Sequence, residues 1–410
     1  MEFKKTKLGV IPSNWEVKPI KEIAETVTDY VANGSFASLA KNVTYKNEED
    51  VAVLIRLVDY NNRFQGGFVF IDEHAYQFLA KSKLFGDEII ISNVGANVGT
   101  VFRCPKLPYK MSLAPNSIMV KFNGNNDFYF HWLRSYNGQQ MLKSIVTGSA
   151  QPKFNKTNFK EMLAPVPPLE EQQKIAAILS ALDEKIAINR EINDNLQQQL
   201  FSLYENMAMT SPCFKEYTLS NLCDFQEGYV NPPQTHPEYF DGEVKWLRAV
   251  DINESFIIET SRTLTEAGFE SAKKSALLFK PNTIAISKSG TIGRLGIIAD
   301  YMCGNRAVIN IAPNDTSMLA FIYCFLKNKQ KEFPDMAVGS VQKNLYVSLL
   351  EPLTVFMPDD ELLTEFNAVG NSILNKIYNN CIENTELANL RDTLLPKFMS
   401  GEIDVSAVQL

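Results

Sequence analysis

The sequence has few of the residues from which catalytic and metal centres are built. Its six cysteines are scattered with no Cys-x-x-Cys pair, and its three histidines lie far apart with no His-Glu-x-x-His motif. Scattered cysteines predict reduced, buried side chains rather than disulfides or metal ligands. A Gly-x-x-x-x-Gly-Lys-Ser/Thr loop is also missing, so an ATP-driven motor is not expected in this chain. We therefore expect neither catalytic residues nor a metal site.

Long hydrophobic runs are missing as well. No stretch approaches the ~18 apolar residues of a membrane-spanning helix. Residues 1–15 contain basic side chains but no apolar core or cleavage site of a signal peptide. We expect a cytoplasmic protein without membrane association. The chain of 410 residues, 45% apolar and 21% charged, has the composition of a globular protein with two or three domains.

An overall positive charge, common in nucleic-acid-binding proteins, is absent, since the formal net charge is −7. Residues 1–160 nevertheless contain 20 Lys and Arg against 14 Asp and Glu, and residues 212–350 contain 14 against 15. Residues 161–211 contain 3 against 8, and residues 351–410 contain 3 against 10. The acidity is thus concentrated in two short segments, which leaves the two longer segments able to bind a polyanion.

What the sequence does contain is a long heptad pattern between Pro165 and Met207. Apolar residues follow one another in steps of four and three if Asn189 and Asn193 fill two of the positions. The apolar members are Ile175, Leu179, Leu182, Ile186, Leu196, Leu200, Leu203 and Met207. This pattern predicts a long helix that packs against another long helix and ends at Thr210-Ser211-Pro212.

The partner helix is predicted in the same chain. A shift of 191 residues moves the pattern to residues 358–398, where Asn380 and Asn384 take the places of Asn189 and Asn193. An asparagine in an apolar seam costs stability but fixes the register and the partner. We interpret the four asparagines as register-setting residues of one intramolecular, antiparallel coiled coil.

The repeat extends beyond the helices. The matching blocks are Leu54–Asn61 with Trp246–Asn253, Ile90–Gly95 with Ala285–Gly290, and Thr147–Gln151 with Val338–Gln342. Blocks in the same order with a drifting offset indicate two copies of one unit. The expected fold class is α+β, with two mixed α/β domains joined by two long antiparallel helices in a pseudo-two-fold duplication. The expected boundaries are 1–160 for domain 1, 161–211 for helix 1, 212–350 for domain 2, and 351–410 for helix 2 with the tail.

Within each copy, β-branched runs broken by glycine predict strands at residues 88–93 and 283–288, with hairpin partners at 100–105 and 294–300. Amphipathic helices are predicted at residues 126–145 and 317–333, ahead of the Thr147–Gln151 and Val338–Gln342 loops. Between the copies the remaining sequence differs almost completely. The shared blocks are interpreted as scaffold and the divergent loops as the parts that differ in task.

Several segments resemble those of one family. Thr147–Asn155 (TGSAQPKFN) and Pro165–Gln172 (PVPPLEEQ), with the opening Gly9–Trp15 and the tail Leu394–Ile403, resemble the specificity subunits of type I restriction–modification enzymes. The resemblance spans essentially the whole chain. The second copy departs from it, with MPDDE at residues 357–361 and with Lys343 where the first copy has Pro152.

The resemblance implies a noncatalytic DNA sequence-specificity subunit. Each globular copy would be a target recognition domain for one half of a split DNA site, and the helix pair would set the spacer and dock two methyltransferase (M) subunits. Restriction (R) motor-nuclease subunits would complete the complex. S-adenosylmethionine, ATP and Mg would be bound by those partners and no cofactor by this chain. The alternative is a duplicated coiled-coil scaffold that binds proteins without reading DNA.

The predicted helix length leads to a spacing without help from the resemblance. Leu169 to Met207 is 38 steps, which corresponds to about 57 Å at ~1.5 Å per residue. At ~3.4 Å per base pair this length matches roughly 17 base pairs. Two similar but unequal copies held apart in this way predict a bipartite, asymmetric DNA site.

Candidate DNA-binding residues fall into shared and divergent loops. In the shared loop, docking onto the helix and contact with phosphate are competing interpretations; base reading is assigned to the divergent loops, for which an ordinary turn is the alternative. The shared-loop candidates are Gln151, Lys153, Lys156 and Lys343. The divergent-loop candidates are Asn61, Asn62, Arg63, Asn93, Asn97, Lys288, Ser289, Thr291 and Arg294. Arg56 and Arg248 are instead expected to pair internally with Asp59 and Asp251.

Asn231-Pro232-Pro233-Gln234 is similar to the Asn-Pro-Pro-aromatic motif of DNA amino-methyltransferases. That motif requires an aromatic ring to stack on a flipped base, which Gln234 cannot do. No glycine-rich cofactor loop follows a strand elsewhere, so this segment is predicted to be a turn.

Overall fold

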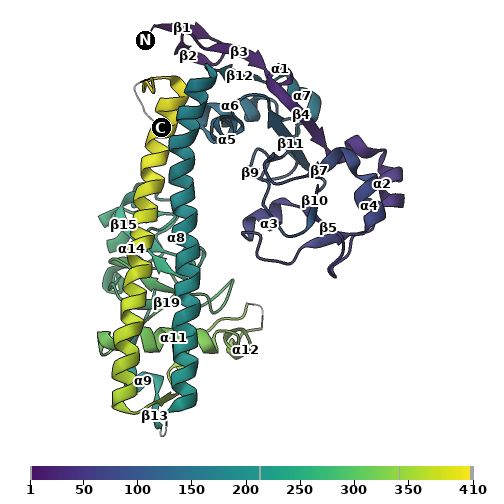
Figure 1. Ribbon diagram of the computed structural model, residues 1–410. Coiled ribbons are helices and arrows are strands. Elements are labelled where there is room, and N and C mark those ends of the chain that lie inside the picture. Colours follow the sequence, from purple (N-terminus) through teal and green to yellow (C-terminus); the bar gives the residue numbers. More distant parts are fainter. Residues whose placement is uncertain (1, 212–213, 341, 407–410) are drawn as a thin grey trace. The chain divides into compact units, whose positions relative to one another are not determined.

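The computed structural model describes residues 2–211, 214–340 and 342–406 (Figure 1). Internal contacts divide the chain into two compact units, Met1–Glu184 with Ala388–Leu410, and Lys185–Leu387. Each unit holds one globular copy and one stretch of each long helix. Pro212, the proline predicted to end the first helix, and Val341 of the second shared loop lie outside the described residues.

The first globular copy contains two four-stranded sheets. Its elements are β1 (Phe3–Thr6), β2 (Gly9–Pro12), β3 (Glu16–Pro19), α1 (Ile20–Ile23), β4 (Ala24–Asp29), η1 (Tyr30–Asn33), α2 (Phe36–Asn42), β5 (Ala52–Ile55), α3 (Leu57–Asn61), β6 (Val69–Ile71), α4 (Glu73–Phe78), η2 (Ala80–Ser82), β7 (Lys83–Leu84), β8 (Ile89–Ser92), β9 (Val101–Arg103), β10 (Lys110–Leu113), β11 (Ser117–Phe122), α5 (Asn126–Arg134), α6 (Tyr136–Ser144), α7 (Lys156–Glu161) and β12 (Leu163–Val166). One sheet has the order β4-β11-β8-β9 and is antiparallel throughout. The other has the order β6-β5-β10-β7, with β5 and β10 parallel.

The second globular copy repeats this plan with one strand more. Its elements are β13 (Lys215–Thr218), α9 (Leu219–Leu222), β14 (Cys223–Glu227), η3 (Pro237–Tyr239), β15 (Phe240–Leu247), η4 (Ala249–Asp251), β16 (Phe256–Ile257), β17 (Thr263–Leu264), α10 (Glu266–Glu270), η5 (Lys273–Ser275), β18 (Leu278–Phe279), β19 (Thr283–Ser287), β20 (Leu295–Ile298), β21 (Met302–Gly304), β22 (Val308–Pro313), η6 (Thr316–Met318), α11 (Leu319–Lys329), α12 (Phe333–Met336), α13 (Val347–Leu350) and β23 (Thr354–Met357). The order β14-β22-β19-β20-β16 matches the first sheet of the first copy and adds β16, while β17-β15-β21-β18 forms the other sheet.

The hairpins predicted from the glycine-broken runs are confirmed in both copies. Ile90 of β8 is paired with Phe102 of β9, and Ile284 of β19 is paired with Ile297 of β20. The stretch predicted as helical from residue 126 is divided into α5 and α6 at Ser135, whose hydroxyl accepts a hydrogen bond from the Gly138 amide at 3.2 Å. A Cβ at Gly138 would lie 2.0 Å from the Trp132 carbonyl oxygen, so this tight break requires glycine.

Helix α8 (Leu169–Thr210) and helix α14 (Asp360–Ser400) are the two long helices, and they run side by side (Figure 1). In the first unit, Ile175 and Leu179 of α8 are buried and Asp183 accepts a hydrogen bond from Arg391 of α14 at 2.6 Å. In the second unit, Leu200 of α8 and Ile377 of α14 belong to one buried cluster. The heptad pattern therefore forms an intramolecular helix pair, as predicted.

The four asparagines of the predicted seam meet in the second unit. Asn380 donates a side-chain hydrogen bond to Asn193 at 2.7 Å, and Asn189 donates one to Asn384 at 3.1 Å. Asn189 also donates to the Glu383 carboxylate at 2.7 Å. The residue numbers rise along α8 as they fall along α14, which is the pairing of antiparallel helices. Asn193 and Asn380 are 6% and 2% exposed, and the Asn193 amide group in turn donates to the Ile377 carbonyl at 3.5 Å, so these buried groups are paired within the helix pair.

One seam position was wrongly predicted. Leu203 is 40% exposed, and the neighbouring Tyr204 occupies the buried side of α8. The Tyr204 ring packs 5.6 Å from the Phe321 ring of α11 and 5.9 Å from the Phe366 ring of α14. Because a globular copy also packs on this part of α8, the buried face is wider than a two-helix seam.

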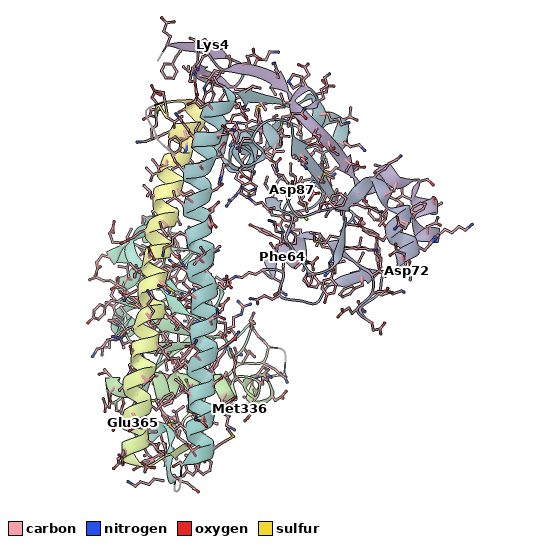
Figure 2. All side chains as sticks on the ribbon, viewed as in Figure 1. Lys4, Phe64, Asp72, Asp87, Met336 and Glu365 are labelled. Carbon is pink, nitrogen blue, oxygen red and sulfur yellow. The ribbon has the colours of Figure 1, made fainter. Side chains whose placement is uncertain are left out.

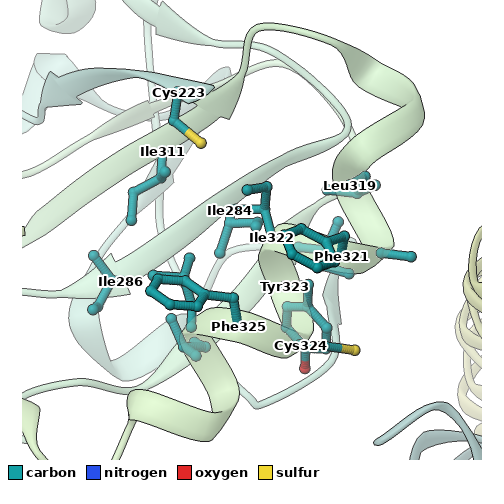
Figure 3. Packing of buried hydrophobic residues seen from close by; sticks show 14 of the residues in the cluster. Cys223, Ile284, Ile286, Ile311, Leu319, Phe321, Ile322, Tyr323, Cys324 and Phe325 are labelled. Carbon is teal, nitrogen blue, oxygen red and sulfur yellow. The ribbon is translucent and has the colours of Figure 1, made fainter. Parts of the chain in front are cut away.

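Helix α11 was expected to be amphipathic, but all residues from Leu319 to Leu326 are buried. The ring of Phe321 on α11 packs against Tyr204 of the long helix α8. Ile284 and Ile286 of β19, a strand of the sheet, belong to the same buried cluster (Figure 3). A helix enclosed between a sheet and other helices has no solvent-facing stripe, which explains its uniformly apolar sequence.

The residues that carry the family resemblance also meet in the first unit. Glu171, in the first turn of α8, accepts hydrogen bonds at 2.7 Å from both Asn14 and the Trp15 indole. The next residue, Gln172, donates to the Pro167 carbonyl at 2.8 Å and accepts from the Asn125 amide at 3.0 Å. The Glu-Gln pair therefore joins the start of the long helix to the globular copy.

Candidate nucleic-acid interface

The two copies share one arrangement at the edge of the sheet that contains β8 or β19, where that strand ends. We call this region the loop edge of each copy; it comprises the ends of β4 and β8 with the start of β11, or the ends of β14 and β19 with the start of β22. Asn93 follows β8, and its backbone amide donates to the Asn116 carbonyl at 3.0 Å. At the equivalent place the Lys288 amide donates to the Ala307 carbonyl at 2.7 Å.

The shared loops are docked on this edge. The Phe154 amide donates to the Asn93 carbonyl at 3.1 Å, and the Leu345 amide donates to the Lys288 carbonyl at 2.9 Å. Each loop closes on itself through a bridge, Thr147 with Lys153 and Val338 with Asn344. The geometry therefore supports docking as a role of the shared loop, onto the sheet edge rather than onto the helix. Phosphate contact remains a prediction for its exposed residues, which are Gln151, Lys153 and Lys343.

Three of the sequence candidates make side-chain contacts with residues far along the chain, and a fourth, Asn62, donates to the nearby Gly66 carbonyl at 3.3 Å. The side-chain amide of Asn93 donates to the Phe154 carbonyl at 2.9 Å, so this residue holds the shared loop. Lys156 forms an ion pair with Asp29 at 3.0 Å, and Lys288 forms one with Glu227 at 2.8 Å. These contacts give all three residues a structural role that the sequence did not reveal, because their partners are more than 60 residues away, at 61, 127 and 61 positions.

One further candidate of the first copy, Asn97, lines an open depression of about 430 Å³. Tyr60, Arg134 and Gln139 line it as well, and the Gln139 amide donates to the Gly99 carbonyl at 3.0 Å. Asn61 and Asn62 follow Tyr60 at the end of α3 and are exposed, as is Arg63. Arg63 and the next residue, Phe64, have φ of 52° and 56°, which is the left-handed region. Figure 2 labels Phe64 in the first globular copy. Asn97 and Tyr60 thus line one depression, and Asn61–Arg63 follow Tyr60 directly in the sequence.

The second copy fills the corresponding place differently. The Gln330 amide donates to the Gly293 carbonyl at 2.9 Å, as Gln139 does to Gly99, but it also donates to the Glu254 carboxylate at 2.9 Å. Glu254 forms an ion pair with Lys327 as well. In the nearby loop, the Ser287 hydroxyl accepts from the Arg294 amide at 2.8 Å and donates to the Thr291 carbonyl. The candidates of this loop are placed as follows: Thr291 is exposed, and Ser289 and Arg294 are partly exposed.

Aromatic side chains that the sequence did not single out line both loop edges. In the first copy, Phe36 and Tyr45 are 81% and 54% exposed and line a cavity of about 570 Å³ with Asp29 and Asn93. In the second copy, Tyr229 donates to the Glu227 carboxylate at 2.6 Å, and the Lys288 ammonium lies 4.8 Å from the centre of the Tyr346 ring. Isolated aromatic residues gave no sequence signal, since only the fold assembles them.

The charge at the second loop edge is fixed by these contacts. Burial acts to raise the pKa of Glu227, but hydrogen bonds from Lys288 and Tyr229 lower it below the ordinary glutamate value. The carboxylate is therefore ionised at neutral pH, and its ammonium partner makes the pair neutral as a whole.

The Arg–Asp pairs are confirmed as internal contacts. Arg56 forms an ion pair with Asp59 at 2.6 Å, and Asp59 is 2% exposed. Arg248 lies 3.7 Å from Asp251, whose carboxylate also accepts from the Arg248 backbone amide at 2.9 Å. Both pairs close the turn after β5 or β15, which removes these arginines from the candidate contacts.

Within the part of the chain that the structure describes, no group of three or more His, Cys, Asp or Glu side chains is placed to hold a metal ion. None of the helices in residues 2–211, 214–340 and 342–406 combines the length and apolarity needed to cross a membrane.

The fold and these edges define a class of protein: a duplicated binding protein that carries two unlike surfaces on one pair of helices. A model of the family described as the type I restriction modification DNA specificity domain matches residues 12–198 and 213–391, and the chain belongs to this family. The family predicted from the motifs is thereby confirmed. The chain is a type I DNA specificity subunit, and a scaffold without DNA recognition is not favoured.

Two relatives match over most of their length. The type I restriction enzyme MjaIX specificity subunit of Methanocaldococcus jannaschii is 26% identical, over 98% of this chain and 97% of its own. The type I restriction enzyme HindI specificity subunit of Haemophilus influenzae is 23% identical, over 72% of this chain and 80% of its own. The crystal structure of a type I restriction–modification S subunit from M. genitalium has a TM-score of 0.54 at 19% identity, covering 94% of this chain and 96% of that one, so the two share a fold.

Proposed function

We propose that the chain is the noncatalytic subunit that reads DNA sequence within a type I restriction–modification complex in the cytoplasm. Each globular copy reads one half of a bipartite, asymmetric site, and the bases between the halves are not read. The observation that carries this proposal is the pair of loop edges, which share their backbone hydrogen bonds but carry different side chains. Equal scaffolds with unequal contacts suit two half-sites of different sequence.

The contacts to DNA are assigned to the loops around each edge. Gln151, Lys153 and Lys343 suit phosphate oxygens, because they are exposed on tight loops where the backbone approaches closely. Asn61, Asn62, Arg63 and Asn97 suit base edges in the first half-site. In the second half-site this task falls to Ser289, Thr291 and Arg294.

The helix pair has two tasks in this proposal. It fixes the spacer between the half-sites, because a continuous helix resists bending and the asparagine pairs fix the register. It also docks two M subunits; Ile188 and Ile192 on α8 are 45% and 37% exposed, and apolar side chains on an otherwise polar helix mark a protein contact. R subunits join the same complex. S-adenosylmethionine, ATP and Mg are bound by these partners.

Binding of duplex DNA by the chain assembled with its cognate methyltransferase tests the function directly. We expect specific binding that weakens steeply with salt, because contacts to phosphates release counterions. Methylome mapping of cells expressing both proteins should then show one bipartite motif with two unlike halves. Assembly with the methyltransferase but no DNA binding would contradict the proposal and favour a protein-binding scaffold. A palindromic motif would contradict reading by two unlike copies.

A further inference from the structure

Each loop edge carries one carboxylate at the same structural position. Asp29 is the last residue of β4 and is paired with Ile118. Glu227 is the last residue of β14 and is paired with Ile309. Ile118 is in turn paired with Ile91 of β8, and Ile309 with Ile286 of β19, the equivalent strand. The two carboxylates therefore correspond, although the segments that follow them share no motif.

The lysines that neutralise these carboxylates do not correspond. Lys156, at the start of α7, lies 3.0 Å from Asp29, whereas Lys288, in the turn after β19, lies 2.8 Å from Glu227. The residue at the place of Lys156 in the second copy is Val347, and the residue at the place of Lys288 in the first copy is Asn93. The carboxylate has kept its position in both copies while its partner has changed, so the carboxylate is the feature that the edge retains.

Both carboxylates remain accessible from the surface. Their side chains are 15% and 20% exposed, and each lies next to flat apolar groups. Asp29 shares a cavity with Phe36 and Tyr45, and Glu227 accepts the hydrogen bond of Tyr229. Neither carboxylate is enclosed in a hydrophobic core. An ion pair with a purely structural role at the end of a sheet would not require exposed aromatic rings beside it.

A carboxylate at a DNA interface is selective because of its charge. It is repelled by phosphates and by the acceptor atoms of guanine and thymine in the major groove. A hydrogen-bond donor stabilises the carboxylate, and in the major groove the exocyclic amino groups of cytosine and adenine are such donors. A neighbouring lysine reduces the repulsion by the phosphates and allows the carboxylate to approach the groove.

We propose, on the basis of the DNA-reading function above, that Asp29 and Glu227 are specificity-determining residues. Each accepts a hydrogen bond from the exocyclic amino group of a cytosine or adenine, Asp29 in the half-site of the first copy and Glu227 in that of the second. Each thereby excludes guanine and thymine at that position.

The test uses the chain assembled with its methyltransferase and a randomised duplex library from which bound sequences are selected and read. In Asp29→Asn, the preference for cytosine or adenine over guanine or thymine should fall by about tenfold or more at one position of one half-site. In Glu227→Gln, the same loss should occur in the other half-site only. Unchanged preferences in both variants would overturn the inference.

Matched variants separate specificity from structure. Lys156→Gln and Lys288→Gln break the same ion pairs from the other side, and they should weaken binding to all sequences while the base preference stays. Asp29→Glu keeps the carboxylate and should keep the preference. If Asp29→Asn and Lys156→Gln behave alike, or if Asp29→Glu loses the preference as well, the pair is structural and the inference is wrong.

The wild-type complex distinguishes the two proposals. If it selects no bipartite sequence, the proposed function itself fails. If it selects one and the Asn and Gln variants select the same sequence with the same discrimination, only the roles of Asp29 and Glu227 fail.

Discussion

At the scale of single residues, contact with phosphate and contact with bases predict different behaviour. Lys343 is exposed on the second shared loop. Replacing Lys343 by Gln should weaken binding to all DNA sequences and reduce the slope of log affinity against log salt by about 0.9, because one phosphate contact is lost. Lys274, exposed in η5 near the other sheet, offers the matched control Lys274→Gln, which should leave the slope unchanged. A change of sequence preference in Lys343→Gln would assign Lys343 to bases instead.

His131 shows how burial of one residue links stability to pH. It is 1% exposed on α5, and burial lowers its pKa from the ordinary value to about 4, against the opposing charge of Asp183. Arg103 and Arg134 lower the pKa further, and Asp127 acts in the opposite direction. The folded protein thus holds a neutral imidazole where the unfolded chain would bind a proton.

We expect the free energy of unfolding to decrease as pH falls from about 6.5 to about 4, by up to about 1.4 kcal/mol per pH unit from this residue. In this window the unfolded state binds the proton and the folded state does not. Replacing His131 by Gln should flatten the dependence, measured by denaturant unfolding of the full chain at a series of pH values. His74→Gln, at an exposed position, serves as control. Equal slopes for wild type and His131→Gln would contradict this account.

At the scale of elements, the asparagine pairs are the feature to test. Asn380→Leu removes the donor that satisfies the buried Asn193 oxygen, so we expect a loss of about 1–3 kcal/mol in the free energy of unfolding. Asn193→Leu combined with Asn380→Leu removes both polar groups and should recover most of that loss. Chemical denaturation of the full chain measures both effects. A double variant less stable than Asn380→Leu would show that the two residues do not act as a pair.

The elements also show where sequence reasoning succeeds. Heptad spacing located both long helices and their asparagines, because a period of three and four residues is a property of one helix face. The hairpins β8–β9 and β19–β20 were found for a similar reason, since glycine-broken β-branched runs are local. Leu203 and the uniformly buried α11 were mispredicted, because each is decided by a third element packed on it, which no local pattern records.

At the scale of the whole molecule, the second unit is one continuous segment, Lys185–Leu387. This segment begins within α8 and ends within α14. Insertion of one heptad after Glu184 and one after Leu387 preserves the facing sides of both helices. We expect the unread spacer of the DNA site to lengthen by about 10 Å, or ~3 base pairs, at ~1.5 Å per residue. Methylome mapping of cells that express the variant with its methyltransferase measures the spacer. A spacer of unchanged length would show that the helix pair does not set it.

The sequence by itself determined the duplication, the paired helices, the α+β class and the family, because repeats, heptads and motifs are written along the chain. It also indicated which loops differ between the copies. Only the tertiary structure decided which residues of those loops are engaged: Asn93, Lys156 and Lys288 are bound by partners at least 61 positions away. It likewise brought Asp29 and Glu227 to equivalent edges beside exposed aromatic rings. Contacts between distant residues depend on how strands and loops pack, and a single sequence contains no local signal for them.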